Sequence, residues 1–312
     1  MKSLSGHKVF ITGVNGFYAR HLVACILGHY GDCEILGIDI KDRCVDNYKG
    51  KYISCDITDY NSVNKIVRRF QPDIVFHLAG IFDERKPALL YQNNIVGSLN
   101  VMNAICAMRK NIRIILSSSC AVYAKADSGK KFLSEKQDIC PHSHYGISKL
   151  AMELLSLSCA KEYNCVEVII ARTFNLIGRG ISAFLLPGKL FTDITRVSKR
   201  KTEKIVKLGN LNTVRDFVDV RDAAQALVSL ALSGRKNNVY NIGSGKGVRV
   251  GNLAGIFIEH IDPEVKVSIE PSLFKKIDPG VIIADAHKIR MHTGWQARFS
   301  LTDSVGYTIG KS

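Results

Sequence analysis

The chain lacks any long hydrophobic run. No stretch of its 312 residues approaches the roughly 18 consecutive apolar residues that a membrane-spanning helix requires. The segment from Met1 to His7 is also too polar and too short to hold the apolar region of a signal peptide. We therefore expect a soluble, unexported, cytoplasmic protein with no membrane partner.

The cysteines lack the spacing of a structural framework. There are nine, an odd number, scattered from Cys25 to Cys165 without a C-x-x-C pair. This pattern suits neither a set of disulfides nor a zinc site. We expect reduced thiols and no bound metal.

Acidic residues are few relative to basic ones. The chain has 43 Lys and Arg against 28 Asp and Glu, a formal net charge of +15. The only dense basic run, residues 196–204, has no interleaved aromatic residues of the kind that stack on bases, so we expect no nucleic-acid partner. Phosphorylated small molecules remain as anionic partners, and a surface charge that only maintains solubility explains the excess equally well.

The first 170 residues alternate between short apolar runs and helical patterns. Apolar strands are predicted at 8–12, 34–40, 74–78, 112–116 and 166–171, and helices at 17–30, 62–70, 87–108 and 144–163. Strands that are apolar throughout and alternate with helices indicate a parallel sheet covered on both faces. The predicted fold class is α/β, a Rossmann-type doubly wound parallel sheet.

The alternation weakens after residue 174. Helices are predicted at 221–233, 250–260 and 301–309 and a strand at 239–242, and the basic stretch near residue 200 resembles a linker. We expect a dinucleotide-binding domain over residues 1–173, joined by part of 213–243. Residues 174–212 and 244–312 would form a smaller α+β substrate domain.

A glycine-rich turn follows the first strand. In the segment Thr12-Gly13-Val14-Asn15-Gly16-Phe17-Tyr18-Ala19, Gly13 allows a tight turn and Gly16 lets the backbone approach a phosphate at the start of a helix. Ala19 takes the third position, which needs only a small side chain. The turn predicts a site for a dinucleotide pyrophosphate.

Asp39 ends the second strand, 20 residues after Ala19. An acid at this spacing accepts hydrogen bonds from the adenosine ribose, and its carboxylate repels a 2′-phosphate. NAD is therefore the favoured cofactor. NADP is not excluded, because Lys41 and Arg43 follow closely and offset that repulsion if they turn inward.

Tyr145 and Lys149 lie four residues apart in the segment YGISK, so a helix places them on one face. An adjacent ammonium favours phenolate and brings the pKa of Tyr145 down from about 10, toward the range in which it exchanges protons with an alcohol or ketone. Ser119 lies just past a predicted strand, at the sheet edge where ligands bind. We predict that Ser119, Tyr145 and Lys149 are catalytic.

Together these motifs resemble the extended short-chain dehydrogenase/reductases that modify nucleotide sugars. The resemblance extends over nearly the whole chain. Its C-terminal motifs, Arg215-Asp216-Phe217 and Thr293-Gly-Trp295 among them, are most similar to the GDP-4-keto-6-deoxymannose reductase branch. Three departures occur: Ala19 and Ala124 stand where glycine is usual, and Lys275-Lys276 replaces a nucleotide-binding Arg.

The resemblance implies roles for further residues. Asn175 and Arg215 would hold the substrate's phosphates, with Ser119 on the reacting oxygen. The residues implied to contact or line the cofactor site are Gly13, Asn15, Gly16, Phe17, Tyr18, Asp39, Asp56, Ile57, Leu78, Ala79, Gly80, Asn94, Ser117, Tyr145, Lys149 and Phe174.

The implied activity is reduction, with NAD(P), of the C4 keto group of a nucleotide-linked 4-keto-6-deoxy sugar, by a homodimer. An NAD-dependent nucleotide-sugar 4-epimerase is the alternative. A non-catalytic dinucleotide sensor is disfavoured, because it has no need of Ser119, Tyr145 and Lys149. The sugar and the nucleotide base stay open at this point.

Dehydration of a nucleotide sugar is not expected. In the family's dehydratases a carboxylate lies between the Ser or Thr and the Tyr of the segment that here reads Ser119-Cys120-Ala121-Val122-Tyr123. None of the intervening residues is acidic. The substitutes that the sequence leaves open are Asp83 and Glu84.

Overall fold

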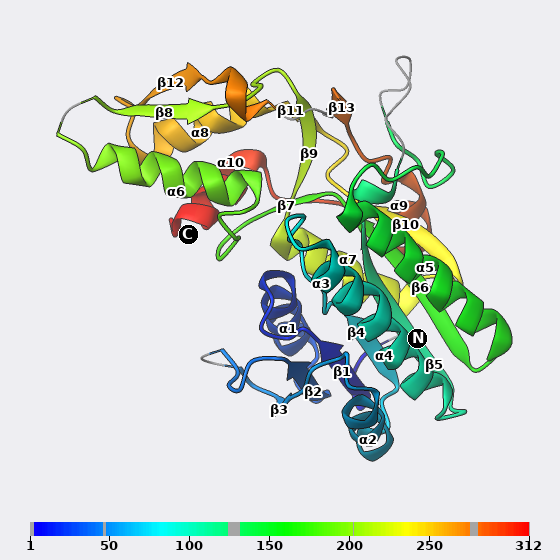
Figure 1. Cartoon of the computed structure of the whole chain (residues 1–312). Coiled ribbons are helices and arrows are strands. Elements are labelled where there is room, and N and C mark those ends of the chain that lie inside the picture. The colour runs from blue at the N-terminus through cyan, green and yellow to red at the C-terminus, as the bar shows by residue number, and fades with distance from the viewer. Residues whose placement is uncertain (1–2, 46–47, 124–131, 202, 275–279, 312) are drawn as a thin grey trace.

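Seven parallel strands form the central sheet of the computed structural model, which describes residues 3–45, 48–123, 132–201, 203–274 and 280–311 (Figure 1). Their order is β10-β6-β5-β4-β1-β2-β3. The strands are β1 (Lys8–Thr12), β2 (Glu34–Asp39), β3 (Lys51–Ser54), β4 (Ile74–His77), β5 (Ile112–Ser119), β6 (Val166–Thr173) and β10 (Asn238–Ile242). The chain order reverses between β1 and β4, where a doubly wound sheet opens its binding crevice. The predicted fold class is confirmed.

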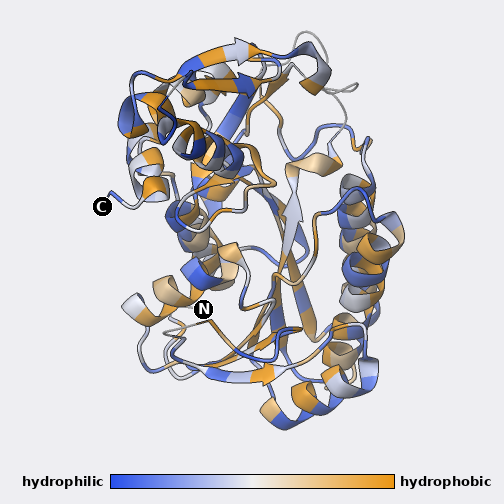
Figure 2. Cartoon of the chain, turned by 60° about the vertical axis from the view of Figure 1, so that its left-hand side comes forward, coloured by the Kyte–Doolittle hydropathy of each residue, from blue (hydrophilic) through white to orange (hydrophobic). Residues whose placement is uncertain are grey.

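Helices cover both faces of this sheet, because its strands carry apolar side chains on both sides. Val9 and Ile11 of β1 pack into one cluster with α1 (Phe17–His29) and α7 (Val220–Ser233). Phe10, between them, belongs to a second cluster on the other face. The helices of that face are α2 (Tyr60–Phe70), α4 (Ser98–Cys106) and α5 (His144–Glu162). Figure 2 shows hydrophobic and hydrophilic residues mixed around these helices, as expected when only one side faces a sheet.

The long helical stretch predicted over 87–108 is helical but not uniform. It consists of α3 (Pro87–Tyr91), a π-helical turn η1 (Gln92–Gly97) and α4. Such turns are rare and are often found at functional sites. Within the described part of the chain, none of the helices combines the length and the hydrophobicity that a bilayer crossing requires.

The C-terminal part builds a smaller body with its own core. Its helices α6 (Leu186–Ser198), α8 (Val250–Ile261) and α10 (Leu301–Ile309) bury Leu190, Phe257 and Val305 against one another. Beside them, β8 (Ile205–Leu208) pairs in parallel with β12 (Lys266–Ile269). The basic stretch near residue 200 connects α6 to β8 inside this body, so it is not a linker between domains.

Short strands connect the two parts. β9 (Val214–Asp219) pairs with β7 (Asn175–Ile177), β11 (Gly247–Arg249) and β13 (Val281–Ile282), then runs into α7, and the chain returns to the large sheet at β10. The remaining elements are η2 (Cys120–Val122), η3 (Pro271–Leu273) and α9 (His287–Thr293).

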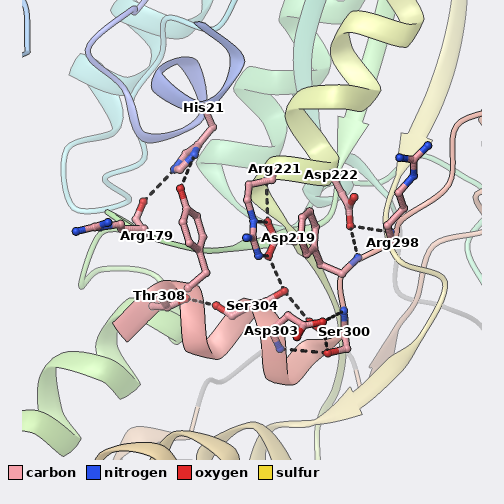
Figure 3. A network of polar contacts seen from close by, with 12 residues as sticks. His21, Arg179, Asp219, Arg221, Asp222, Arg298, Ser300, Asp303, Ser304 and Thr308 are labelled. Carbon is pink, nitrogen blue, oxygen red and sulfur yellow. Dashed lines mark hydrogen bonds and ion pairs between the residues drawn. The ribbon is translucent and has the colours of Figure 1, made fainter. Parts of the chain in front are cut away.

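A polar network fastens the C-terminal helix α10 to the rest (Figure 3). Asp219, the N-cap of α7, accepts hydrogen bonds from the Arg221 guanidinium (Nε at 2.9 Å and Nη2 at 2.8 Å) and from the Ser304 hydroxyl (2.8 Å). The guanidinium lies over the rings of Phe299 and Tyr307, 3.6 and 4.0 Å from their centroids. These contacts hold the smaller body against the helix layer of the sheet.

Candidate functional site

The glycine-rich turn lies between β1 and α1, at the crevice of the sheet. Gly13 has a φ of 70°, and a Cβ there would lie 2.7 Å from the Cα of Ala79. Gly16 is the N-cap of α1 and supplies no side-chain hydrogen bond to it, which leaves backbone N–H groups of the first turn for an anion. The close approach of backbone to backbone fits the pyrophosphate of a dinucleotide.

The two residues that follow this turn begin α1. Phe17 places its ring edge-on to His21, 5.4 Å between centroids. The Tyr18 hydroxyl donates a hydrogen bond to the carbonyl of Ala223 (2.9 Å), and burial raises the pKa of this phenol. The side chain of Tyr18 therefore anchors α1 to α7, and only its backbone is placed for a phosphate.

The structure brings Asp39 next to the glycine-rich turn, as the spacing predicts. One carboxylate oxygen accepts from the N–H of Asn15 (3.1 Å) and the other from the N–H of Lys41 (3.2 Å). The Asn15 side chain accepts from the N–H of Val45 (2.9 Å) and donates to the carbonyl of Arg43 (3.1 Å). Asn15 thus ties the turn to the loop after β2, and this fixes the carboxylate that would meet the ribose.

Asp56 and Ile57 follow β3 at the same sheet edge. The Asp56 carboxylate accepts from the N–H of Thr58 (2.8 Å), and Ile57 packs so closely on η1 that a Cβ at Gly97 would lie 2.5 Å from its Cδ1. Asn100 donates to the carbonyl of Ile57 (3.0 Å). Contacts with η1 and α4 therefore fix the segment Asp56–Ile57, which is predicted to contact adenine.

A buried chain of hydrogen bonds crosses the crevice from β1 to η1. The Ser98 hydroxyl donates to the carbonyl of Asn94 (2.6 Å), so it accepts from Nε2–H of His77 (2.8 Å). Nδ1 of His77 then accepts from the Thr12 hydroxyl (2.7 Å), whose oxygen accepts from the N–H of Ala79 (3.1 Å). Burial lowers the pKa of His77 to about 3, which keeps the ring neutral and fixes this order of donors. No role for His77 is predicted from the sequence, because its place within a buried strand carries no local signal for these hydrogen bonds.

Asn94 organises the loop after β4. Its side chain accepts from the N–H of Ile81 (2.8 Å) and donates to the Ile81 carbonyl (3.0 Å) and to the Ser148 hydroxyl (3.0 Å). A Cβ at Gly80 would lie 3.0 Å from Oδ1 of Asn94 and 3.5 Å from Nζ of Lys149. The segment Leu78 to Gly80 therefore lies between the glycine-rich turn and α5.

The three predicted catalytic residues lie together at the carboxyl end of β5. The Ser119 hydroxyl lies near the Tyr145 phenol and accepts from the N–H of Ala121 (3.1 Å). Lys149 donates to the carbonyl of Ser117 (2.8 Å), and its Nζ lies 5.8 Å from the centroid of the Tyr145 ring. A carbonyl oxygen between Ser119 and Tyr145 would meet two hydroxyl donors.

The expected lowering of the Tyr145 pKa by Lys149 is wrong for this arrangement. Burial raises the pKa of Tyr145 to about 12, although the hydrogen bond from Ser119 acts in the opposite direction. Burial also lowers the pKa of Lys149 to about 8, and the nearby Glu153 carboxylate offsets part of this. A low-dielectric site disfavours the charged form of both groups.

A buried ion pair lies beneath Lys149. Arg172 of β6 donates to both oxygens of Glu153, with Nη2 2.6 Å from Oε2, and both side chains are only 3% exposed. The Ser118 hydroxyl donates to the same carboxylate. The sequence carries a signal for the place of Glu153 alone, because Glu153 follows Lys149 by four residues and shares its helix face.

The residues predicted to bind substrate phosphates lie on neighbouring strands. Asn175 starts β7 and donates its side-chain amide to the carbonyl of Asp216 (2.9 Å). Arg215 lies next to Asp216 on β9 and donates to the carbonyl of Val214 (2.9 Å). Phe174 is buried against Tyr123, with 6.5 Å between ring centroids, so its ring is covered by protein. Ala124 and Lys275-Lys276 lie outside the described residues.

Comparisons with known proteins give one matching family model and several whole-chain relatives. The model for the NAD dependent epimerase/dehydratase family matches residues 9–243. A GDP-6-deoxy-D-mannose reductase of Pseudomonas aeruginosa is 25% identical, over 96% of this chain and 94% of its own.

Two solved structures resemble the fold closely. RMD from Pseudomonas aeruginosa, complexed with NADPH, has a TM-score of 0.85 at 23% identity and 98% coverage of both chains. The UDP-glucose 4-epimerase of Thermotoga maritima, with UDP-glucose, has a TM-score of 0.86 at 24% identity, covering 97% of this chain and 98% of its own. The glycine-rich turn at Gly13 and the Asp39 carboxylate fit a dinucleotide, as the family model also implies. The chain is therefore an NAD(P)-dependent enzyme that belongs to the NAD dependent epimerase/dehydratase family.

Proposed function

We propose that the protein reduces the C4 keto group of a nucleotide-linked 4-keto-6-deoxy sugar. The observation that carries this proposal is the pairing of Ser119 and Tyr145 as two hydroxyl donors at the carboxyl end of β5, beside Lys149. The whole-chain similarity to a GDP-6-deoxy-D-mannose reductase supports the choice of substrate class.

The chain's own residues supply the polar part of the reaction. Ser119 donates to the C4 oxygen and polarises the carbonyl, and Tyr145 delivers a proton to the oxygen as it becomes an alkoxide. A phenol with a pKa of about 12 is protonated at neutral pH, as an acid must be. Asn175 and Arg215 would bind the diphosphate, for which an Arg fork is well suited.

NAD(P) would be held by the glycine-rich turn, Asp39, the segments after β3 and β4, Tyr145 and Lys149. When bound, its reduced nicotinamide supplies a hydride. Asp39 favours NAD over NADP, because its fixed carboxylate lies where a 2′-phosphate would be repelled.

A nucleotide-sugar 4-epimerase is the second candidate. The same three residues also catalyse oxidation of a C4 hydroxyl, and an acid that favours NAD suits an enzyme that retains its cofactor between the two half-reactions. The structural similarity to a UDP-glucose 4-epimerase supports this candidate.

Liquid chromatography coupled to mass spectrometry separates the two candidates, because C4 epimers have equal mass and differ in retention time. Purified protein is incubated with GDP-, UDP-, CDP- and dTDP-linked hexoses and their 4-keto-6-deoxy derivatives, with NADH, with NADPH or with no added cofactor. Reduction gives a mass gain of two hydrogens and consumes reduced cofactor stoichiometrically. Epimerisation changes no mass and continues without added cofactor. Turnover only with NADPH would contradict the assignment of Asp39.

We also propose a cytoplasmic homodimer. Its chain would divide into a dinucleotide-binding domain of residues 1–173 with part of 213–243, and a substrate domain of 174–212 and 244–312. The packing of α7 on the large sheet and the pairing of β10 within it support the inclusion of part of 213–243 in the first domain.

A further inference from the structure

The loop between β4 and α3 packs on the residue proposed as the acid. Phe82 sets its ring edge-on to the Tyr145 ring, 4.7 Å between centroids at 83°. Ile81, just before it, is fixed by the side chain of Asn94, 2.8 Å from its N–H and 3.0 Å from its carbonyl. The loop is therefore held at its base and reaches over the phenol.

Glu84 of this loop binds the first turn of α5. Its two carboxylate oxygens accept one backbone N–H each, from His144 (3.1 Å) and Tyr145 (3.0 Å). The Ser143 hydroxyl accepts from the next N–H, that of Gly146 (3.0 Å). The carboxylate also lies at the positive end of the α5 dipole, where a negative charge is stabilised. Two of the backbone groups that place Tyr145 are thus held by a residue about 60 positions earlier in the chain.

Asp83, the neighbouring acid, has different partners. Its carboxylate accepts from Nε of Arg85 at 2.8 Å and from Nη2 at 3.1 Å. The Arg85 guanidinium lies 5.4 Å from the ring centroid of Phe184, in the segment before α6. The two adjacent carboxylates therefore differ in their partners: Glu84 binds backbone N–H groups of α5, whereas Asp83 binds Arg85 of the same loop.

We propose that Glu84 is a positioning residue for Tyr145: by binding the N–H groups of His144 and Tyr145 it fixes the helix turn that aims the phenol at Ser119. The inference rests on the proposed function, for which Tyr145 is the acid. The same carboxylate acts together with burial to raise the pKa of Tyr145, which keeps the phenol protonated. Proton transfer depends steeply on placement, so a looser turn lowers the rate of the chemical step more than it lowers binding.

The test compares Glu84→Gln and Glu84→Ala with the matched control Asp83→Asn, which removes a charge from the same loop without touching α5. Gln keeps one acceptor oxygen and Ala keeps none. We expect kcat on a 4-keto-6-deoxy nucleotide sugar to fall about threefold for Gln and tenfold or more for Ala, with KM within about twofold of wild type. Asp83→Asn keeps wild-type kcat. Amide hydrogen exchange at His144 and Tyr145 should accelerate in the same order, and thermal unfolding of each variant shows that it is folded.

The outcomes are distinct. Wild-type kcat in a folded Glu84→Ala protein, or an equal loss in Asp83→Asn, overturns the positioning role while the wild-type activity upholds the proposed function. Faster exchange with unchanged kcat also overturns it, because Glu84 is then only a helix cap. A wild-type protein that turns over none of the nucleotide sugars contradicts the proposed function itself and the positioning role with it.

Discussion

Tyr145 and Lys149 share one helix face, and burial disfavours the charged form of each. The pKa of the phenol is raised to about 12 and that of the ammonium is lowered to about 8. At neutral pH the site therefore holds a protonated phenol near the Ser119 hydroxyl, beside an ammonium that loses its proton more readily than an exposed lysine. This state suits donation of a proton to a reduced carbonyl oxygen.

Replacing the phenol tests its role directly. Tyr145→Phe removes only the hydroxyl and leaves the ring in contact with Phe82, so the fold and cofactor binding should persist. We expect kcat to fall by about 100-fold or more, as for the loss of a positioned acid. Steady-state kinetics with reduced cofactor measures the change, and Tyr60→Phe on the surface of α2 is the control. A variant that retains wild-type turnover excludes Tyr145 as the acid.

Lys149 gives a stability prediction with a defined pH window. Its pKa is about 8 in the folded protein and about 10.4 when unfolded, so the buried ammonium destabilises the fold at pH values below 8. As pH rises from 8 to 10.4 the folded protein loses this proton first, and the penalty disappears. Lys149→Met should therefore raise the free energy of unfolding at pH 7 by about 2 kcal/mol, a gain that fades above pH 10, while activity is lost. Urea unfolding at pH 7 and pH 10 measures it, and an equal effect at both values would contradict the assigned cause.

At the scale of elements, the glycine-rich turn and α1 form one unit for binding a phosphate. Gly13 is restricted twice, by its φ of 70° and by the backbone of Ala79, 2.7 Å from any added Cβ. Gly28 of α1 has open space around the same position. The two glycines therefore form a matched pair.

Alanine at the two positions should act in opposite directions. Gly13→Ala should cost more than about 1 kcal/mol of stability, because an L-residue is strained there, and should abolish binding of NAD(H). Gly28→Ala should stabilise the fold by about 0.5 to 1 kcal/mol, the ordinary helix preference for alanine, and bind NAD(H) normally. Thermal unfolding and fluorescence titration with NADH measure both. Normal NADH affinity in Gly13→Ala would remove the turn from the cofactor site.

The elements that could be predicted are those with strong local patterns. The apolar strands of the large sheet, the turn at Gly13 and the helix that carries Tyr145 follow from hydrophobic period and turn chemistry. β3 was missed, because its four residues are mostly exposed at the sheet edge. The π-helical turn at Asn94 was also missed, and the contacts of Asn94 with Ile81 and Ser148 are not encoded in any local pattern.

At the scale of the whole molecule, the C-terminal part was the least predictable. β7, β11 and β13 have two or three residues each, and their partners on β9 lie tens of residues away. Such strands are defined by pairing rather than by their own sequence. The helix α6 was missed as well, and the charged segment after it was interpreted as a linker. The candidate site was more predictable than this part, because Ser119 ends β5 of the large sheet and Tyr145 and Lys149 lie on α5, which packs on that sheet.

Dehydration of a nucleotide sugar requires a free acidic or basic side chain at the site. The placement of the nearby carboxylates predicts that the protein does not catalyse this reaction. Loss of water across C5 and C6 needs an acid for the leaving hydroxyl and a base for the C5 proton. Among the described residues, the substitutes are already engaged: Glu84 by two N–H groups of α5, Asp83 by Arg85. Cys120, one of the residues between Ser119 and Tyr123, is no substitute either: burial raises the pKa of its thiol to about 12, so it is a poor base at neutral pH. Incubation of the protein and NAD with GDP-mannose and other nucleotide hexoses should therefore give no product lighter by one water, as followed by mass spectrometry. A 4-keto-6-deoxy product from these substrates would place the protein among the dehydratases and require Glu84 to leave α5 during turnover.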